Sequence, residues 1–198
     1  MSPQRRKFLL GLLASAAIPP LSSELANAQS APFTLLPTPA CGVDGAPTVA
    51  QTEGPYFTPN SPAKRNLAAD SPGGTPFLVG GLVLDTACRP IPNALIEIWH
   101  ADQNGVYDNN GYRLRGHQTS DAQGAWWFET IVPGRYPGRT RHFHFKVQQA
   151  GGATLTTQLY LPGDPENERD GGYDARLLLE IAEDAGDRFG RYDFVLGS

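Results

Sequence analysis

The sequence predicts an all-β domain, a two-sheet β-sandwich with long loops and at most one short helix. Glycine and proline supply 22 and 18 of the 198 residues, and that many would interrupt long helices. Short apolar or alternating runs recur between Gly- and Pro-containing turns, a spacing typical of sandwich and barrel strands. Only 18% of the residues are charged, so the composition does not indicate disorder.

The expected elements begin after a polar, proline-rich stretch that ends near residue 75. Residues 77–84 form an apolar run interrupted by two glycines, and residues 94–99 are apolar except for one glutamate. An Asp-Ala-Gln-Gly turn then leads into residues 125–131, which start with an apolar run. Each of these three runs is expected to be a strand.

Further strands are expected at residues 141–148 and 154–161, where apolar and polar residues alternate on either side of an Ala-Gly-Gly turn. Residues 176–183 are expected to form the one short helix. Residues 191–196 are expected to be a closing strand.

The N-terminus resembles an export signal over residues 1–28. A basic start at residues 5–7 precedes a mostly apolar run at residues 8–18, and residues 26–28 have the small-x-small form of a cleavage site. The apolar run is too short to span a bilayer core, which takes about 20 residues. The adjacent arginines favour a twin-arginine signal over an ordinary secretory signal. We therefore expect an exported protein, periplasmic or secreted, with no stable membrane association after cleavage.

Two further features bear on the exported chain, in which residues 29–50 are expected to be an irregular arm and residues 51–198 the domain. Cys41 and Cys88 are its two cysteines, and an even count in an exported protein favours a disulfide. The alternatives are two unpaired thiols or a metal site, which the lack of a Cys-x-x-Cys pair disfavours.

The net charge of −4 argues against a nucleic-acid partner bound through a basic surface.

His142 and His144 are the strongest candidates for chemistry. Residues i and i+2 of a strand point to the same face, so both imidazoles should project together while Phe143 and Phe145 face the core. Two convergent histidines are half of a metal site, although such a pair can also be ordinary surface decoration.

Two tyrosines in neighbouring loops could complete such a site. Tyr107 follows the strand expected at 94–99, and Tyr136 lies in a turn that leads into the histidine strand. Phenolate is a hard anionic donor that suits ferric iron. The alternative is that both are ordinary loop aromatics.

Several ordered motifs together resemble the intradiol ring-cleavage dioxygenases, the family of protocatechuate 3,4-dioxygenase, in its single-domain secreted form. They run from about residue 49 to the C-terminus: Thr52-Glu53-Gly54-Pro55-Tyr56-Phe57, Cys88-Arg89-Pro90-Ile91-Pro92-Asn93-Ala94, Trp99-His100-Ala101-Asp102 with Gly105 and Tyr107, Arg139-Thr140-Arg141-His142-Phe143-His144-Phe145, Thr157-Gln158-Leu159-Tyr160 and Gly163-Asp164-Pro165.

The resemblance implies one ferric ion per chain and cleavage of a catechol between its two hydroxylated carbons by O2, giving a cis,cis-muconate-type dicarboxylate. The four iron ligands of the family fall on Tyr107, Tyr136, His142 and His144. The resemblance also implies that Tyr136 leaves the iron when the diol binds and that Tyr107 stays.

The family's active-site arginine falls on Arg139 and its substrate-side glutamine on Gln158. Gly54, Pro55 and Tyr56 match a segment that lines the pocket in relatives.

The chain also departs from the family. The segment between Tyr136 and His142 is shorter than in the protocatechuate enzymes, so their substrate preference does not carry over. There is no room for the helical dimerisation domain of catechol 1,2-dioxygenases, although an oligomer is possible. His100 and His117 match no ligand position and are expected to be structural or exposed.

Arg135 and Arg141 are expected to be surface or loop-bracing charges. The rival interpretation of the whole chain is an exported transthyretin-like β-sandwich that binds a ligand or carries a metal without oxygenase turnover.

Overall fold

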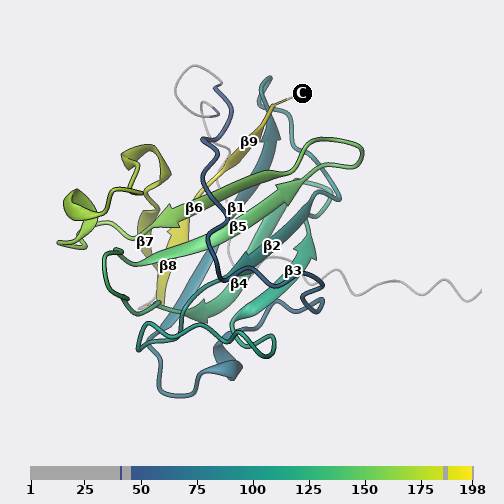
Figure 1. The fold of residues 1–198 in the computed structure, drawn as a ribbon. Coiled ribbons are helices and arrows are strands. Elements are labelled where there is room, and N and C mark those ends of the chain that lie inside the picture. The colour runs from purple at the N-terminus through teal and green to yellow at the C-terminus, as the bar shows by residue number, and fades with distance from the viewer. Residues whose placement is uncertain (1–40, 42–45, 185–186, 198) are drawn as a thin grey trace, which may run out of the picture.

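Two β-sheets pack face to face in the computed structural model, which describes residue 41 and residues 46–184 and 187–197. The four-stranded sheet lies in front in Figure 1 and has the order β3-β2-β5-β6, and the five-stranded sheet behind it has the order β4-β1-β8-β7, with β9 also paired to β1. The strands are β1 (Pro76–Asp85), β2 (Leu95–Trp99), β3 (Arg115–Thr119), β4 (Ala125–Ile131), β5 (His142–Gln148), β6 (Leu155–Tyr160), β7 (Glu180–Asp184), β8 (Asp187–Arg191) and β9 (Phe194–Leu196).

Helical structure within the described residues is limited to three 3₁₀ turns, η2 (Ala68–Asp70), η3 (Asn167–Arg169) and η4 (Ala175–Leu177). No helix in these residues is long and apolar enough to cross a membrane. The predicted all-β sandwich is confirmed. The expected signal at 1–28 and most of the expected arm at 29–50 lie outside the described residues.

The alternation of β5 sets up both the core and the opposite face of the front sheet. Phe143, Phe145 and Val147 are fully buried in the cluster between the sheets. His142 and His144 must then point out of the sandwich, because side chains alternate along a strand. β5 pairs with β2 and β6 on either side, so Trp99 and Gln158 lie opposite His144 and on the same face.

The predicted helix at 176–183 is wrong. Its place is taken by η4 and by β7, which pairs antiparallel with β8. Pairing with β8 supplies the reason, because it fixes the chain from Glu180 onward as a strand, and the buried Leu179 leads into it beside the exposed Glu180.

The closing strand expected at 191–196 is shorter in the structure, as β9, and it is preceded by β8, a strand that was not expected and that ends at Arg191. β8 and β9 pair in parallel with successive parts of β1. β3 was not expected, because its polar sequence, Arg-Gly-His-Gln-Thr, has no apolar alternation. The remaining strands lie within one residue of their predicted bounds.

Residues 46–57, here called the strap, run from the back sheet to the front sheet and pass in front of β6 and β5 in Figure 1. The strap is tied to β9 through the Thr48 amide, which donates to the Val195 carbonyl at 2.9 Å, and to β6 through the Gln51 amide, which donates to the Thr156 carbonyl at 2.8 Å. A disulfide joins Cys41 to Cys88 upstream of the strap. The strap therefore covers part of the face onto which the two histidines project.

Candidate metal centre

His142 and His144 converge on the outer face of the front sheet. Their Nε2 atoms are 3.1 Å apart, and both side chains are almost fully buried beneath loops. The Nδ1 of His142 lies 2.7 Å from the Thr140 carbonyl, which can only accept, so this nitrogen carries the proton and Nε2 offers a lone pair. Burial lowers the pKa of His142 to about 4 and the pKa of His144 well below its ordinary value. Both imidazoles are therefore neutral at pH 7, as metal ligation requires.

Tyr107 and Tyr136 lie beside the two histidines. The Tyr136 hydroxyl is 3.4 Å from Nε2 of His142, and the Tyr107 ring centroid is 5.7 Å from that of Tyr136 and 6.1 Å from that of His144. Burial raises the pKa of both phenols, so each is protonated in the absence of a cation. Tyr107 is buried, whereas Tyr136 is only half-buried.

Two glycines bring the tyrosine-bearing loops together. The Gly134 amide donates to the Asp102 carbonyl at 2.7 Å, which joins the loop after β2 to the loop after β4. A Cβ atom on Gly105 would lie 2.1 Å from the carbonyl oxygen of Arg135 and 3.3 Å from the amide of Tyr136. The two backbones can approach this closely only because these positions carry no side chain.

Aromatic rings enclose one side of the cluster. Trp99 stacks on His144 with centroids 4.9 Å apart, and Tyr56 stacks on Tyr107 with centroids 4.5 Å apart. Phe57 packs against Trp99 at 4.8 Å. These contacts exclude water from the histidines and Tyr107.

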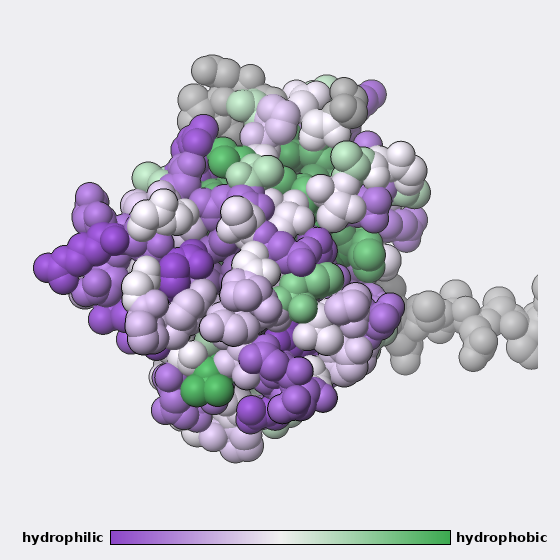
Figure 2. All heavy atoms as spheres, viewed as in Figure 1, coloured by the Kyte–Doolittle hydropathy of each residue, from purple (hydrophilic) through white to green (hydrophobic). Residues whose placement is uncertain are grey.

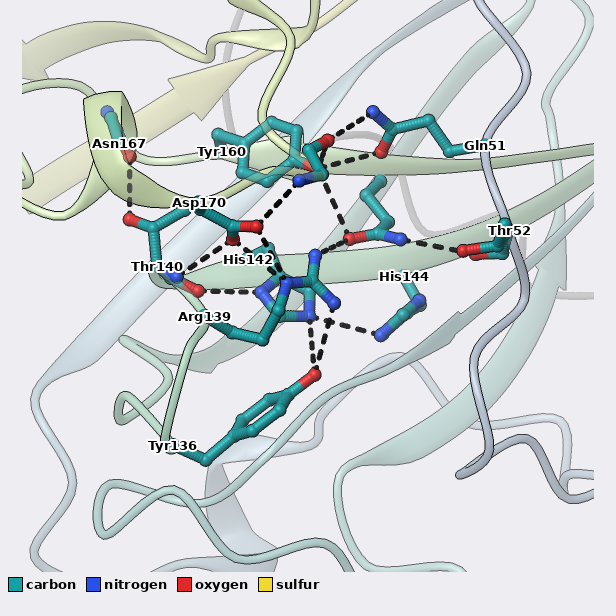
Figure 3. A network of polar contacts seen from close by, with 12 residues as sticks. Gln51, Thr52, Tyr136, Arg139, Thr140, His142, His144, Tyr160, Asn167 and Asp170 are labelled. Carbon is teal, nitrogen blue, oxygen red and sulfur yellow. Dashed lines mark hydrogen bonds and ion pairs between the residues drawn. The ribbon is translucent and has the colours of Figure 1, made fainter.

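Arg139 lies beside Tyr136 and His142, as Figure 3 shows. Its Nη1 donates to the Tyr136 hydroxyl at 3.3 Å and its Nη2 to Oε1 of Gln158 at 2.5 Å. The amide nitrogen of Gln158 donates in turn to the strap carbonyl of Thr52 at 3.1 Å. Burial lowers the pKa of Arg139, but hydrogen bonding to Asp170 more than offsets this and leaves the pKa raised, so the guanidinium is charged.

The Gly-Pro-Tyr segment of the strap meets the cluster at two of its three positions. The backbone of Gly54 passes against His144, since a Cβ there would be 3.4 Å from Cε1 of the ring. Tyr56 supplies the stacking contact to Tyr107, and Pro55 is exposed between them.

The other candidates have structural positions. His100 faces the core side, where Nε2 lies 2.7 Å from the Thr130 hydroxyl and the ring packs edge-on against Phe143. His117 is half-buried on β3 beside Ser61. Arg135 and Arg141 both pair with the buried carboxylate of Asp164.

The sequence did not indicate Asp164 or Asp170 as partners of these arginines, because both carboxylates lie in a polar loop without periodicity. The hydrogen bond between Tyr160, the last residue of β6, and Gln51 of the strap, at 2.8 Å, was also missed, because the two residues lie 109 positions apart and no local pattern marks the contact.

The donors present fit a ferric ion. No three His, Cys, Asp or Glu side chains of the described residues form a metal-binding group, so any site here depends on the tyrosines. The Tyr107 hydroxyl is buried and has no hydrogen-bond partner, a costly arrangement that a bound cation would relieve. Two neutral imidazole nitrogens and two phenol oxygens are donors that a hard cation can take once it displaces the phenolic protons.

Comparisons with known proteins give one consistent result. A family model described as "Dioxygenase" matches residues 52–196. A hydroxyquinol 1,2-dioxygenase of Rhodococcus opacus is 36% identical over 141 residues, which cover 59% of this chain and 47% of the relative. A catechol 1,2-dioxygenase of Acinetobacter baylyi is 28% identical over 175 residues, covering 73% and 56%. This chain thus spans about half the length of these curated relatives.

Solved structures extend the match. The dioxygenase domain of a dioxygenase carbohydrate-binding protein fusion from Streptomyces sp. SirexAA-E is 47% identical with a TM-score of 0.74, and the match covers 77% of this chain and 99% of that domain. A hydroxyquinol 1,2-dioxygenase from Pseudomonas putida DLL-E4 is 28% identical with a TM-score of 0.69, covering 77% and 67%.

Proposed function

The chain belongs to the intradiol ring-cleavage dioxygenase family, and from that premise we propose that it is a non-haem iron dioxygenase that cleaves a catechol between its two hydroxylated carbons. The product would be a cis,cis-muconate-type dicarboxylate. One observation carries the proposal: two neutral histidines and two tyrosines converge in a buried aromatic site beside a charged arginine. These four side chains, Tyr107, Tyr136, His142 and His144, would hold one ferric ion.

When bound, ferric iron supplies a Lewis acid that draws electron density from a deprotonated diol and so lowers the electronic barrier to reaction with O2. The protein must accept the protons that the diol loses. Tyr136 suits this task, because it is half-buried and its hydroxyl already lies 3.3 Å from Nη1 of Arg139. A protonated Tyr136 that leaves the metal can therefore keep a hydrogen-bond partner.

Tyr107 suits the opposite role. Its side chain is buried and stacks on Tyr56 at 4.5 Å, so it has no room to swing away. Arg139 would then act on the substrate, because its guanidinium can stabilise negative charge that develops on the ring.

The charges around the site favour a substrate without a carboxylate. Each basic side chain of β5 and of the Tyr136 loop is already paired with a carboxylate: Arg135 and Arg141 with Asp164, Arg139 with Asp170, and Lys146 with Glu53. The charge of each cation on these segments is thus already balanced, and a substrate carboxylate would find no uncompensated cation among them. We therefore infer that catechol or hydroxyquinol, rather than a benzoate derivative, is the substrate class.

We also propose that the protein is exported by the twin-arginine route. The pattern of residues 1–28 supports this, as does the disulfide between Cys41 and Cys88, since disulfides persist mainly in oxidising compartments. Replacing both Arg5 and Arg6 by lysine should retain the protein in the cytoplasm, and continued export of that variant would point to an ordinary secretory signal.

Purified protein tests the proposed activity. The iron-loaded protein should be red-brown from tyrosinate-to-iron charge transfer, and catechol should cause oxygen uptake. His142→Ala and His144→Ala should each lose iron and turnover, whereas His117→Ala, on the same sheet face but outside the cluster, should keep both. A coloured protein that takes up no oxygen with catechol or hydroxyquinol would favour a metal carrier, and a colourless one a simple binding protein.

A further inference from the structure

Asp170 holds Arg139 in an arrangement that leaves the site-facing end of the guanidinium free. The Asp170 side chain is 1% exposed, and both of its oxygens accept from the single Nε–H of Arg139, at 3.0 and 2.9 Å. Both Nη groups therefore remain available, one for Tyr136 and one for Gln158. A carboxylate bound through the two Nη atoms would instead have placed its own oxygens at the site-facing end of the guanidinium.

The same carboxylate also fixes the backbone next to Arg139. The Thr140 amide donates to Oδ2 at 2.9 Å, and the Gly172 amide donates to Oδ1 at 2.8 Å. Burial raises the pKa of Asp170, but these amides and the guanidinium more than offset it and leave the pKa lowered, so the group is ionised at neutral pH. Asp170 thus joins the loop that carries Arg139 to the loop that follows β6.

The second loop is itself held in place. The Thr140 hydroxyl donates to Oδ1 of Asn167 at 2.6 Å. The Gly172 carbonyl accepts from the Tyr160 hydroxyl at 2.5 Å and from the side-chain amide nitrogen of Gln51 at 2.7 Å. Figure 3 shows Tyr160 and Gln51 at the upper edge of the network. The position of Asp170 is therefore determined by the sheet and the strap and does not depend on substrate.

We propose that Asp170 is a positioning residue that orients Arg139 toward the reacting diol before the substrate binds. This inference rests on the proposed dioxygenase function for its catalytic consequence. An unrestrained arginine has many rotamers, and freezing one of them when charge develops would raise the barrier. The buried ion pair removes that freedom in advance, which is how preorganised charge accelerates a reaction.

Asp164 offers a matched control in the same loop. Its side chain is 2% exposed and also pairs with arginines of the Tyr136 loop, namely Arg135 and Arg141, but it makes no contact with Arg139. Asp164→Asn therefore removes an equivalent buried ion pair without touching the proposed orientation.

The first experiment needs neither iron nor activity. In iron-free protein, the Nε–H of Arg139 should exchange slowly with solvent in ¹⁵N–¹H spectra, its signal being assigned by its loss in Arg139→Lys. We expect exchange to become at least about tenfold faster in Asp170→Asn and to be unchanged in Asp164→Asn, because only the former loses the charge-assisted hydrogen bond. Equal exchange in the wild type and Asp170→Asn would overturn the proposal.

The second experiment uses the iron-loaded enzyme with catechol. Asp170→Asn should lower kcat between about tenfold and a hundredfold, less than the hundredfold to thousandfold typical when a stabilising donor is removed outright. KM and iron content should change less than about threefold, and Asp164→Asn should keep the wild-type kcat. Combining Asp170→Asn with Arg139→Lys should cost no more than Arg139→Lys alone, since the two residues act as one unit.

Asp170→Glu keeps the buried charge but lengthens the side chain, so it should fold and should still lower kcat, and it replaces Asp170→Asn in the assay if that variant does not fold. Additive effects of the Asp170 and Arg139 changes, or equal losses in the Asp170 and Asp164 variants, would contradict the positioning role. If the wild type shows no turnover, the proposed function fails, and the exchange measurement still decides whether Asp170 orients Arg139.

Discussion

Gly105→Ala is expected to separate the two loops that carry the tyrosines. Gly105 has a φ of +81°, and a Cβ there would lie 2.1 Å from the Arg135 carbonyl oxygen. Carbon and carbonyl oxygen normally approach no closer than about 3.3 Å. The loops must therefore move apart by more than about 1 Å, which carries Tyr136 away from Tyr107.

The magnitude has two parts, and Gly138 separates them. Gly138 lies in the Tyr136 loop with a φ of +79°, but a Cβ there meets nothing within 4 Å. Gly138→Ala should therefore lower the unfolding free energy only by the cost of placing alanine in a left-handed backbone conformation, about 1–2 kcal/mol. Gly105→Ala should have the same backbone cost and, in addition, the cost of the contact between its Cβ and the Arg135 carbonyl, typically about 1–3 kcal/mol.

Denaturant unfolding of the two variants gives the difference in unfolding free energy, and metal analysis gives the iron content. We expect Gly105→Ala to be less stable than Gly138→Ala by about 1–3 kcal/mol, with less bound iron and a weaker visible band. If the two variants unfold alike and bind iron equally, the close approach at Gly105 does not set the spacing of the tyrosines.

Other parts of the molecule give further expected results. Replacing Cys41 and Cys88 by serine should lower the unfolding free energy by about 4 kcal/mol, because the bridge closes a loop between residues 47 positions apart and the chain-entropy model assigns that loop this cost. Denaturant titration measures the change, and an unchanged midpoint would show that the bridge contributes nothing. Arg139→Lys should retain iron and colour, but the enzyme–catechol complex should accumulate in rapid-mixing absorbance, because lysine lacks the planar guanidinium group of arginine. Turnover at the wild-type rate would place Arg139 outside the reaction. Tyr136→Phe should keep iron, with weaker colour, but bind catechol more slowly and with a steeper pH dependence. Tyr107→Phe should alter the spectrum of the substrate complex as well, and wild-type binding by Tyr136→Phe would show that Tyr136 is not the departing base.

The strands and the histidine pair could be predicted because both follow from local periodicity. His142 and His144 share a face for the same reason that Phe143 and Phe145 share the core, and alternation alone decides it. The prediction failed where periodicity was short or absent. The run at 176–183 was too short to separate a helix from a strand, and only its pairing with β8 makes it β7.

The surroundings of Arg139 could not be predicted, because its partners are distant in sequence. Asp170 lies 31 residues downstream and Gln158 lies 19 residues downstream, and no local pattern marks either contact. Gln158 was expected on the substrate side through the resemblance to the family. In the structure the Gln158 side chain makes two hydrogen bonds within the protein: its Oε1 accepts from Arg139, and its amide nitrogen donates to the Thr52 carbonyl.

Most of the face viewed in Figure 2 is hydrophilic, and hydrophobic residues appear there only in small separate groups. No broad apolar surface is therefore visible on this side that would suggest a protein partner covering the strap. The strap residues Tyr56 and Phe57 instead pack inward, on the buried cluster of Trp99, Ala101 and Tyr107.

The different roles proposed for the two tyrosines follow from their environments, since the residue type is the same. Tyr107 is buried, stacked on Tyr56 and without a hydrogen-bond partner, so a metal bond is the best interaction open to its oxygen. Tyr136 is half-buried and already has a donor in Arg139, so losing the metal would cost its oxygen less. Paired groups of one chemical type commonly divide acid–base tasks in this way, through burial and neighbours. In the proposed arrangement Asp170 maintains the asymmetry, because it holds the arginine whose Nη1 donates to the Tyr136 hydroxyl.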